Sequence, residues 1–455
     1  MRRIKRFLIL VCRFMEGTDT AWNTQCNVSS VTLGLRLLAL EALKYNATLL
    51  LVVLASDNQN THALSGVRIL ELGQIIAGTY GSQLLSDLGA EVIKIEPPNG
   101  DLGRLTSIAP YRGQSGLFLT FNRNKKSMVI NLKSDKGLKI FYDLVKISDV
   151  VVDNFRPGVL EKLKIDYQSL RKLNNKIIQC SVTGFGDTGK YKDLPALDII
   201  IQSISGLMAI TGEPNRPPAR VGIPISDLGG GVFSSNGILA ALYQRERTGV
   251  GTRVELSMFD AMLSLLSYMG TMWLTNRELP EPQGSKHEYT VPWQAFSAKD
   301  GYLVIAARQD VFWEKLCSVL NLPKLSSDER FKTNQDRVEN RDVLVPILED
   351  QFIKRTVEDW LKDFREAGVP AAPVNNLDAV FSEPPVSERQ MIVSYEHPEV
   401  GKVKLPGNPI KLGGMTEVIS KPAPLLGEHT EELLKSLLKL SPGQVKELRE
   451  AGAIS

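Results

Sequence analysis

The sequence predicts an α/β fold whose parallel sheet is covered by helices on both faces. From Gly66 to about residue 185, short runs rich in β-branched residues alternate with longer amphipathic stretches. Strands separated by helices of about 10 to 15 residues need crossover connections, and such crossovers produce parallel sheets that are buried on both faces. With 455 residues the chain is long enough for roughly three domains.

Five strands are predicted in the first half of the chain, at VRILEL (67–72), EVIKIE (91–96), SMVINL (127–132), DVVVDNF (149–155) and KIIQCSVTGF (176–185). Apolar residues at helical spacing predict helices over 77–88 and 136–147, between these strands. The same spacing predicts helices over 229–247 and 258–276. The triplet Gly229–Gly231 permits a close backbone contact at the start of the first of these.

A second α/β region follows the irregular segment 278–294, which is the predicted domain boundary. The elements predicted from there onward are a strand at 302–307, helices near 310–320, 339–352 and 356–366, a strand at 402–405, and helices at 428–440 and 442–451. Proline-rich segments between residues 370 and 387 separate the two halves of this series.

Residues 1–64 are predicted to form an extension that is a leader or an unstructured arm. The basic start and short apolar core of residues 1–15 resemble a secretory or transit peptide, but no convincing small-residue cleavage site follows. The apolar run at 47–55 is nine residues long, whereas a membrane-spanning helix needs about 20. We therefore expect no membrane contact and a cytoplasmic protein, or a mitochondrial matrix protein if the extension contains a transit peptide.

The charge balance argues against a nucleic-acid partner. The sequence has 54 Lys and Arg against 51 Asp and Glu, and the surplus lies within residues 1–64. Proteins that bind polyanions usually carry a basic surplus that displaces counterions from phosphates. The four cysteines and four histidines lack the spacing of zinc ligands, so neither a metal site nor a permanently bound cofactor is expected.

Asp227 is the first candidate catalytic residue. It follows the strand-like run GIPIS (222–226) and precedes Leu228 and three glycines. Such a backbone leaves the carboxylate open and brings amide N–H groups close to it, as a carboxylate nucleophile and its oxyanion site require. A helix N-cap is the alternative interpretation. Asp198 precedes an apolar helical run and is interpreted mainly as a helix cap and a charge on the helix dipole.

Cations and turns near the ends of predicted strands point to a phosphorylated ligand. The segment NRNKKS (122–127) holds three cations, and either a phosphate site or a solvated loop explains it. Lys133 and the turn Asn154–Arg156 follow adjacent strands at their carboxyl ends, where ligands of open α/β sheets bind. The segment 184–190 satisfies GxGxxG, but Tyr191 stands where a phosphate loop needs Ser or Thr, so a glycine-rich turn is predicted.

Several segments together resemble the class III CoA-transferases, a family that includes transferases and α-methylacyl-CoA racemases. They are LSGVRILEL (64–72), AGTYGSQLLSDLGAEVIKIEPP (77–98), NRNKKS (122–127), DNFRPGVLEKL (153–163), SGLMAITG (205–212), RVGIPISDLGGG (220–231) and PLLGEHTEELL (424–434). The resemblance runs in order from about residue 64 to residue 454. The segment QGSKHEYTVPWQ (283–294) is most similar to enzymes of the succinyl-CoA:glutarate type.

The resemblance implies an unusual architecture. It implies a Rossmann-like large domain built from both ends of the chain, over 65–275 and 395–455, and a small α/β domain over 284–385. It also implies an interlocked homodimer. A folded monomer is then not expected, because the linkers of a lone chain would lack a core.

The resemblance also implies functional residues. An aspartate matching Asp227 is the nucleophile of the family's transferases, and it forms first an aspartyl–acyl anhydride and then an aspartyl-CoA thioester. The positions implied for CoA, which is a substrate here, are Ile130, Asn131, Leu132, Lys133, Asn154, Phe155, Arg156 and Lys162. A glycine-rich loop that covers the intermediate in some members matches Gln283–Lys286, which has a single glycine.

The implied activity is transfer of CoA from succinyl-CoA to a dicarboxylic acid. Arg220, Lys286 and His287 are the candidate partners of the distal carboxylate of that acid. Racemases of the family need a histidine just before the aspartate that matches Asp198, and Leu197 stands there instead. A racemase and a catalytically silent CoA-binding protein are the alternatives.

Overall fold

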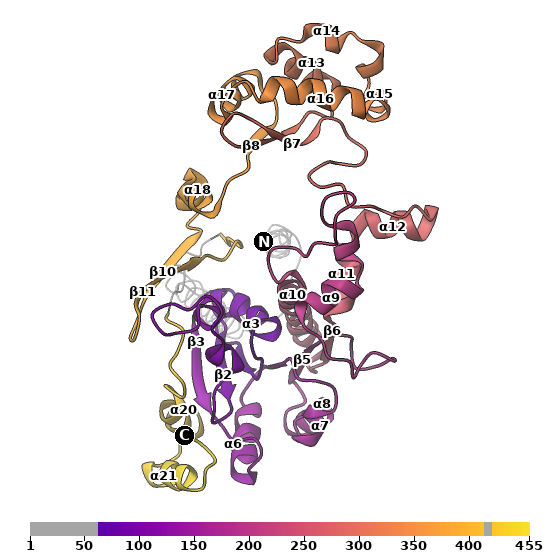
Figure 1. The fold of residues 1–455 in the computed structure, drawn as a ribbon. Coiled ribbons are helices and arrows are strands. Elements are labelled where there is room, and N and C mark those ends of the chain that lie inside the picture. Colours follow the sequence, from indigo (N-terminus) through magenta and orange to yellow (C-terminus); the bar gives the residue numbers. More distant parts are fainter. Residues whose placement is uncertain (1–61, 414–420) are drawn as a thin grey trace, which may run out of the picture. The chain divides into compact units, whose positions relative to one another are not determined.

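The structure is a computed structural model that describes residues 62–413 and 421–455. A six-stranded sheet has the order β3-β2-β1-β4-β5-β6, and all neighbouring strands run parallel (Figure 1). Its strands are β1 (Arg68–Glu71), β2 (Glu91–Glu96), β3 (Lys125–Val129), β4 (Val150–Asp153), β5 (Ile178–Thr183) and β6 (Arg253–Ser257). The prediction of an α/β fold with a parallel sheet is confirmed. The strand order is that of a doubly wound nucleotide-binding sheet.

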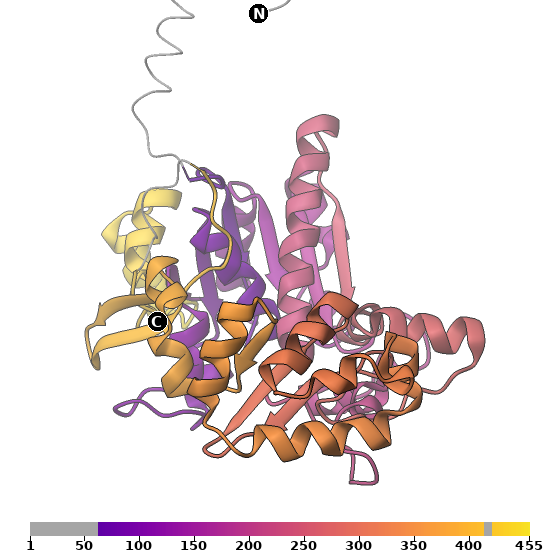
Figure 2. The ribbon, with the colours of Figure 1, turned by 90° about the horizontal axis from the view of Figure 1, so that it is seen from above.

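The sheet is covered on both faces, because neighbouring residues of each strand point to opposite sides. Ile69 of β1 belongs to an apolar core shared with helices α3 (Ala77–Asp87) and α10 (Ile225–Thr248). Leu70 belongs to a second core, shared with α6 (Asp135–Val145). Figure 2 shows the long helix α10 beside the strands.

The second core also contains helices from the end of the chain. Leu433 and Leu434 of α20 (Thr430–Leu438) and Val445 of α21 (Pro442–Glu450) are buried in it. Residues far apart in the sequence therefore build one core. The smaller helices of this part of the structure are α4 (Leu102–Leu105), α5 (Gly116–Phe121), α7 (Val159–Lys162), α8 (Tyr167–Leu173) and α9 (Asp198–Ile204), with a 3-10 turn at Leu207–Ile210.

The glycine triplet brings α10 into close contact with α3. A Cβ atom at Gly231 would lie 2.8 Å from Cδ1 of Tyr80, so no other residue fits there without a shift. Helix α10 begins at Ile225, after Pro224. The strand-like run at 222–226 therefore forms no strand: Ile225 and Ser226 are the first residues of α10, and the Ser226 amide donates to the Asp198 carboxylate.

Two further differences from the sequence pattern concern the region after α10. The helix predicted over 258–276 is divided into α11 (Met258–Leu265) and α12 (Ser267–Asn276), because Ser267 has a left-handed φ of 55°. Strand β6 is not predicted, because it lies at the sheet edge and only Ser257 of its residues is buried.

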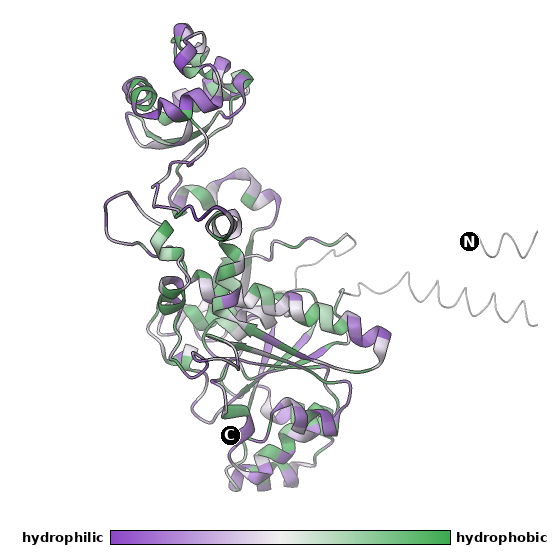
Figure 3. Cartoon of the chain, turned by 90° about the vertical axis from the view of Figure 1, so that its right-hand side faces the viewer, coloured by the Kyte–Doolittle hydropathy of each residue, from purple (hydrophilic) through white to green (hydrophobic). Residues whose placement is uncertain are grey.

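Residues 291–371 have an apolar core of their own. It contains Phe296, Trp313, Phe352 and Phe364. The elements of this region are the antiparallel strands β7 (Trp293–Ser297), β8 (Tyr302–Ala306) and β9 (Ala371–Pro373), the helices α13 (Asp310–Val319), α14 (Pro323–Ser326), α15 (Asn334–Glu339), α16 (Arg341–Phe352) and α17 (Val357–Ala367), and a 3-10 turn at Glu329–Phe331. Figure 3 shows hydrophilic and hydrophobic residues interspersed along these helices, as a core on one side requires.

Short helices and a hairpin connect this region to the C-terminal helices. They are α18 (Leu377–Ser382), α19 (Pro384–Glu388), β10 (Ile392–His397) and β11 (Gly401–Pro406). The domain boundaries at 65–275, 284–385 and 395–455 stay predictions. So do the interlocked homodimer and the cellular compartment.

In the described ranges 62–413 and 421–455, no helix is long and apolar enough to cross a membrane. The predicted N-terminal extension lies outside the described residues as far as residue 61.

Candidate active site

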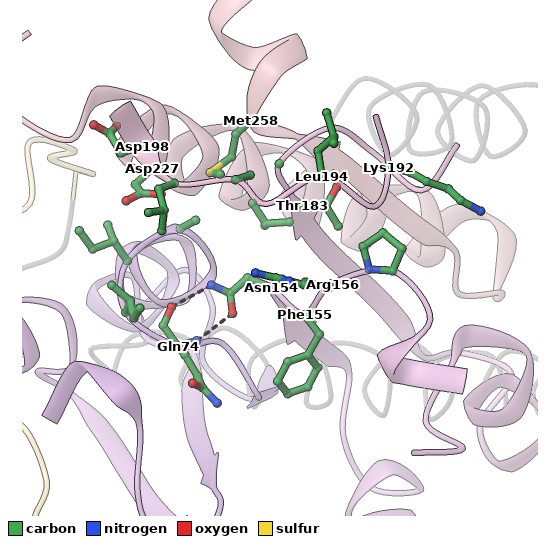
Figure 4. Close-up of a pocket in the computed structure, with 18 residues that line it drawn as sticks. Gln74, Asn154, Phe155, Arg156, Thr183, Lys192, Leu194, Asp198, Asp227 and Met258 are labelled. Atoms are coloured by element: carbon green, nitrogen blue, oxygen red, sulfur yellow. Dashed lines mark hydrogen bonds between the residues drawn. The ribbon is translucent and has the colours of Figure 1, made fainter. Parts of the chain in front are cut away.

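The sheet topology places a crevice between β1 and β4. The strand order reverses there, and the loops that leave the two strands diverge at their carboxyl ends, where doubly wound folds bind ligands. A pocket lies at this point (Figure 4). Its lining residues are Gln74–Ala77, Asn154–Pro157, Val182–Gly184, Lys192, Leu194, Ala196–Asp198, Asp227 and Met258.

Asn154 joins the two loops that border the crevice. Its side-chain oxygen accepts a hydrogen bond from the Gln74 amide (2.9 Å), and its side-chain nitrogen donates to the Gln74 carbonyl (2.8 Å). Figure 4 shows this two-point pairing. It fixes the loop after β1 against the turn after β4.

Asp227 lies in the first turn of α10, and its side chain is half-buried. Burial and the nearby charge of Asp198 raise the pKa of Asp227 to about 7. No hydrogen bond to the Asp227 carboxylate is formed by the residues that the structure describes. Its interpretation as a helix N-cap is wrong, because Pro224 occupies that position. The carboxylate is thus unpaired beside the pocket.

Asp198 holds its carboxylate on the same side of the pocket as that of Asp227 (Figure 4). One oxygen of Asp198 accepts hydrogen bonds from the amide (2.8 Å) and hydroxyl (2.6 Å) of Ser226. The other oxygen accepts from Nε2 of Gln202 (2.6 Å). These three hydrogen bonds hold the Asp198 carboxylate in place, and its charge acts on the neighbouring Asp227.

The position of Asp198 corrects its predicted role. It is the first residue of α9, as an acid at a helix start should be, but Leu197 is the N-cap and the carboxylate does not cap its own helix. It ties α9 to α10 through Ser226. Sequence reasoning left Asp198 out of the site, because this contact joins residues 28 positions apart.

Most of the predicted CoA positions gather around two neighbouring pockets. Ile130, Asn131, Leu132, Lys133 and Phe155 line a second pocket together with Leu72, Gln74, Ile95–Asn99 and Leu163. Asn154, Phe155 and Arg156 line the pocket that contains Asp227. The two pockets share Gln74 and Phe155. Lys162 is exposed on α7 and lines neither pocket.

The second pocket has a wall that the C-terminal segment supports. Ile130 forms an isolated antiparallel bridge with Ile454, and the Asn131 amide donates to the carbonyl of Ala453 (2.9 Å). The Ile130 amide also donates to the carbonyl of Glu96 at the end of β2 (2.9 Å), so the backbone that is predicted to hold CoA is fixed from both sides.

Two of the three cations in the segment 122–127 form neither a phosphate site nor a solvated loop, while Lys126 is partly exposed and pairs with Glu91 (3.3 Å) and Glu432 (3.2 Å). Arg123 is buried and pairs with Asp87 (2.6 Å). Lys125 is buried and pairs with Glu71 (2.6 Å). Both predictions fail for these two residues because each side chain points into the core toward a carboxylate. The glycine-rich turn at 184–190 is confirmed, with left-handed Gly186 and Gly189.

The candidate acceptor residues line neither of the two pockets in this chain. Arg220 and Lys286 are exposed, and His287 packs against Trp293 with ring centroids 5.2 Å apart. Their segments are connected through residues 211 and 212: Gly284 donates its amide hydrogen to the carbonyl of Gly212 (2.7 Å), and Ala219, next to Arg220, donates to the carbonyl of Thr211 (3.3 Å).

The segment of Arg220 is also linked to the site. The amide of Val221 donates to Oε1 of Gln202 (2.9 Å), and Gln202 in turn donates to Asp198. Sequence reasoning missed Gln74 and Gln202 as well as Asp198. Gln74 is identified by its place after β1, where the strand order reverses. That reversal is known only once the order of the strands in the sheet is known.

Asp227→Asn should stabilise the protein at alkaline pH. The folded pKa of Asp227, about 7, exceeds the unfolded value near 3.8, so stability is lost as the pH rises from about 4 to 7. Urea unfolding at pH 5 and pH 8 should give the variant an advantage that is larger at pH 8. The exposed control Asp193→Asn should show no such gain. An advantage of Asp227→Asn that is equal at both pH values would contradict the raised pKa.

The chain is similar to known proteins over most of its length. The profile of the family described as CoA-transferase family III matches residues 64–430. Succinyl-CoA:glutarate CoA-transferase of Homo sapiens is 37% identical over 400 residues, which is 88% of this chain and 91% of the relative. Acetyl-CoA:oxalate CoA-transferase of Acetobacter aceti is 40% identical over 374 residues, 81% of this chain and 94% of the relative.

A solved structure is also similar. The crystal structure of a CAIB/BAIF family protein from Brucella suis has a TM-score of 0.75 and 36% identity, and the match covers 83% of this chain and 100% of that one. The family profile, the sequence relatives and the shared fold lead to one conclusion: the chain belongs to the family III CoA-transferases.

Proposed function

We propose that this enzyme transfers CoA between two carboxylic acids, with Asp227 as the nucleophile. The Asp227 carboxylate attacks the thioester carbonyl of the donor, which gives an aspartyl–acyl anhydride and CoA thiolate. The thiolate then attacks the aspartyl carbonyl, so the donor acid leaves as a carboxylate and an aspartyl-CoA thioester remains.

The second half of the reaction reverses these steps with the acceptor. The acceptor carboxylate attacks the aspartyl thioester, and a new anhydride forms as CoA thiolate leaves. The thiolate attacks the acyl carbonyl of the acceptor, which yields the new acyl-CoA and restores the Asp227 carboxylate. Each step exchanges one acyl bond for another, so neither ATP nor water is consumed.

The observation that carries the proposal is the unpaired Asp227 carboxylate in a pocket that adjoins the predicted CoA site. A nucleophile must be free of strong hydrogen bonds, and the described residues form none with it. Asp198 contributes by repulsion, because a fixed negative charge next to Asp227 destabilises its carboxylate. Conversion of Asp227 to a neutral anhydride or thioester relieves that repulsion, which favours acylation.

CoA is proposed to lie along the two neighbouring pockets. Lys133, Arg156 and Lys162 face its phosphates, and the backbone near Ile130 and Asn154 holds the adenine and the pantetheine arm. The support is that Gln74 and Phe155 are common to both pockets, so a long thin ligand passes from one to the other. CoA enters as substrate, and no permanent cofactor is part of the scheme.

Succinyl-CoA is the proposed donor and a dicarboxylic acid the proposed acceptor. The human relative is named for succinyl-CoA and glutarate. The distal carboxylate needs a cation, and Arg220, Lys286 and His287 lie on two connected segments, one of which is linked to Asp198 through Gln202. A racemase has less support, because Leu197 precedes Asp198 and no histidine lines the pocket of Asp227.

The enzyme is proposed to act as a homodimer. Leu197 and the helices α9, α11 and α12 expose large apolar side chains, which come from two stretches of the chain. They are Leu197, Ile199, Ile200, Leu263, Leu265, Tyr268, Trp273 and Leu274. Patches of this kind mark protein interfaces, and a second copy of the chain is the proposed partner.

Trapping should identify Asp227 as the acylated residue. After incubation with succinyl-CoA, hydroxylamine should convert Asp227 to a hydroxamate that peptide mass mapping detects. Asp227→Ala should lose this adduct and slow CoA transfer by about 10³-fold or more, because the covalent route is gone. Its affinity for free CoA should stay close to that of the wild type. The control Asp193→Asn should be labelled normally, and an unlabelled Asp227 in active wild-type enzyme would exclude the mechanism.

Acceptor preference should separate dicarboxylates from monocarboxylates. With succinyl-CoA as donor, kcat/KM for glutarate should exceed that for butyrate by about tenfold or more. Only glutarate has a distal carboxylate that can form a charge-assisted hydrogen bond with a cation of the enzyme. Arg220→Met should reduce the rate with glutarate and leave that with butyrate unchanged. The exposed neighbour Arg216 provides the matched control, Arg216→Met. Equal rates with the two acids would rule out the dicarboxylate assignment.

Sedimentation equilibrium should give twice the chain mass of 50.3 kDa. Replacing Trp273 and Leu274 by serine should weaken the dimer, because both side chains lose their apolar contacts. A wild-type protein that sediments as a monomer at micromolar concentration would refute the dimer.

A further inference from the structure

The loop between β1 and α3 has a conformation that its sequence disfavours. Residues 72–76 form this loop, and Gln74, Ile75 and Ile76 line the pocket of Asp227. Ile75 has a φ of 65°. A β-branched residue is a rare occupant of the left-handed region, because its Cβ substituents crowd the backbone there. Such a turn persists only where the surroundings hold it.

Three side chains hold three consecutive residues of the loop. Nζ of Lys94 donates to the carbonyl of Gly73 (2.8 Å). Asn154 pairs with both backbone groups of Gln74. The amide of Ile75 donates to Oδ1 of Asp101 (3.2 Å).

Lys94 and Asp101 are themselves an ion pair inside the protein. Their charged atoms are 2.6 Å apart, and each side chain is only 1% exposed. Lys94 also pairs with Glu71 (2.7 Å), which in turn pairs with Lys125. Burial opposes the charge of Lys94, but Glu71 and Asp101 outweigh it and raise the pKa of Lys94. Asp101 also caps α4 through the Gly103 amide (2.6 Å).

We propose that Asp101 is a positioning residue for acyl transfer, held by Lys94 and acting through the left-handed turn at Ile75. It does not line the pocket. The inference rests on the proposed role of Asp227. By fixing Ile75, Asp101 keeps the Gln74–Asn154 pair and the start of α3 in place along the pocket of Asp227. Helix α3 has no side-chain cap, since its N-cap is Ile76, so Asp101 and its neighbours determine where the helix begins.

Asp101→Asn tests this role with little change in size. The amide keeps one acceptor oxygen, but its NH₂ group must face either the Lys94 ammonium or the Ile75 N–H, so one contact of the loop is lost. We expect kcat for CoA transfer to fall about tenfold, because a small displacement near reacting atoms is costly. Affinity for free CoA should fall much less than kcat does, since the wall at Ile130–Lys133 is untouched.

The matched control is Asp87→Asn. Asp87 is also buried in the same part of the protein and pairs with Arg123, but it lies at the other end of α3. Both variants should lower the unfolding temperature, and only Asp101→Asn should lower kcat. Adding Ile75→Gly to Asp101→Asn should restore much of kcat, because glycine adopts a positive φ without strain. If Asp101→Asn does not fold, Asp101→Glu shifts the carboxylate by one methylene, and the same loss of kcat is expected.

An equal loss of kcat in the two asparagine variants would overturn the inference, and so would an unchanged kcat in Asp101→Asn or no recovery in the double variant. The rate of hydroxamate formation at Asp227 separates this inference from the proposed function. Wild-type enzyme that is never labelled at Asp227 refutes the proposed function. Wild-type enzyme that is labelled, together with Asp101→Asn labelled at the same rate, refutes only the role of Asp101.

Discussion

The pairing of Asn154 with the backbone of Gln74 is the contact on which the site depends. A parallel sheet with the order β3-β2-β1-β4-β5-β6 opens a crevice where the strand order reverses, because consecutive connections leave that point in opposite directions. Without a bond across it, the two loops would move independently. Two hydrogen bonds between Asn154 and Gln74 connect the loops across the crevice. Gln74 lines both pockets, so both depend on this connection.

The carboxylates around the crevice are of two kinds, those paired with buried cations and those without a cation. Beneath the loop after β1, buried acids are matched by buried bases: Glu71 and Asp101 face Lys94 and Lys125. Buried charges of this kind hold geometry and are costly to break singly. Asp227 has a second negative charge, that of Asp198, nearby. Among the described residues no cation pairs with either carboxylate. Different side chains thus hold the loop in place and carry the reactive carboxylate.

Much of the fold follows from the sequence, while the site follows only in part. Five strands and the main helices are predicted because burial on both faces leaves continuous β-branched runs. Asp227 is singled out by its glycines, yet its local structure is a helix start, which Pro224 could have indicated. Arg123 and Lys125 resemble a phosphate site because a sequence shows their charges and not their distant partners, Asp87 and Glu71. The same limit hides Asp198, whose contact with Ser226 exists only after α9 and α10 pack.

The bridge between Ile130 and Ile454 has a consequence for biosynthesis. One wall of the second pocket rests against a segment near the end of the chain, whereas the strands beneath it come from the first half. During translation the sheet can assemble before α20 and α21 are made. The apolar surface that these two helices later cover is exposed to solvent until then. This wall of the second pocket is therefore complete only after α20 and α21 have packed against the sheet and residues 453 and 454 have met residues 130 and 131.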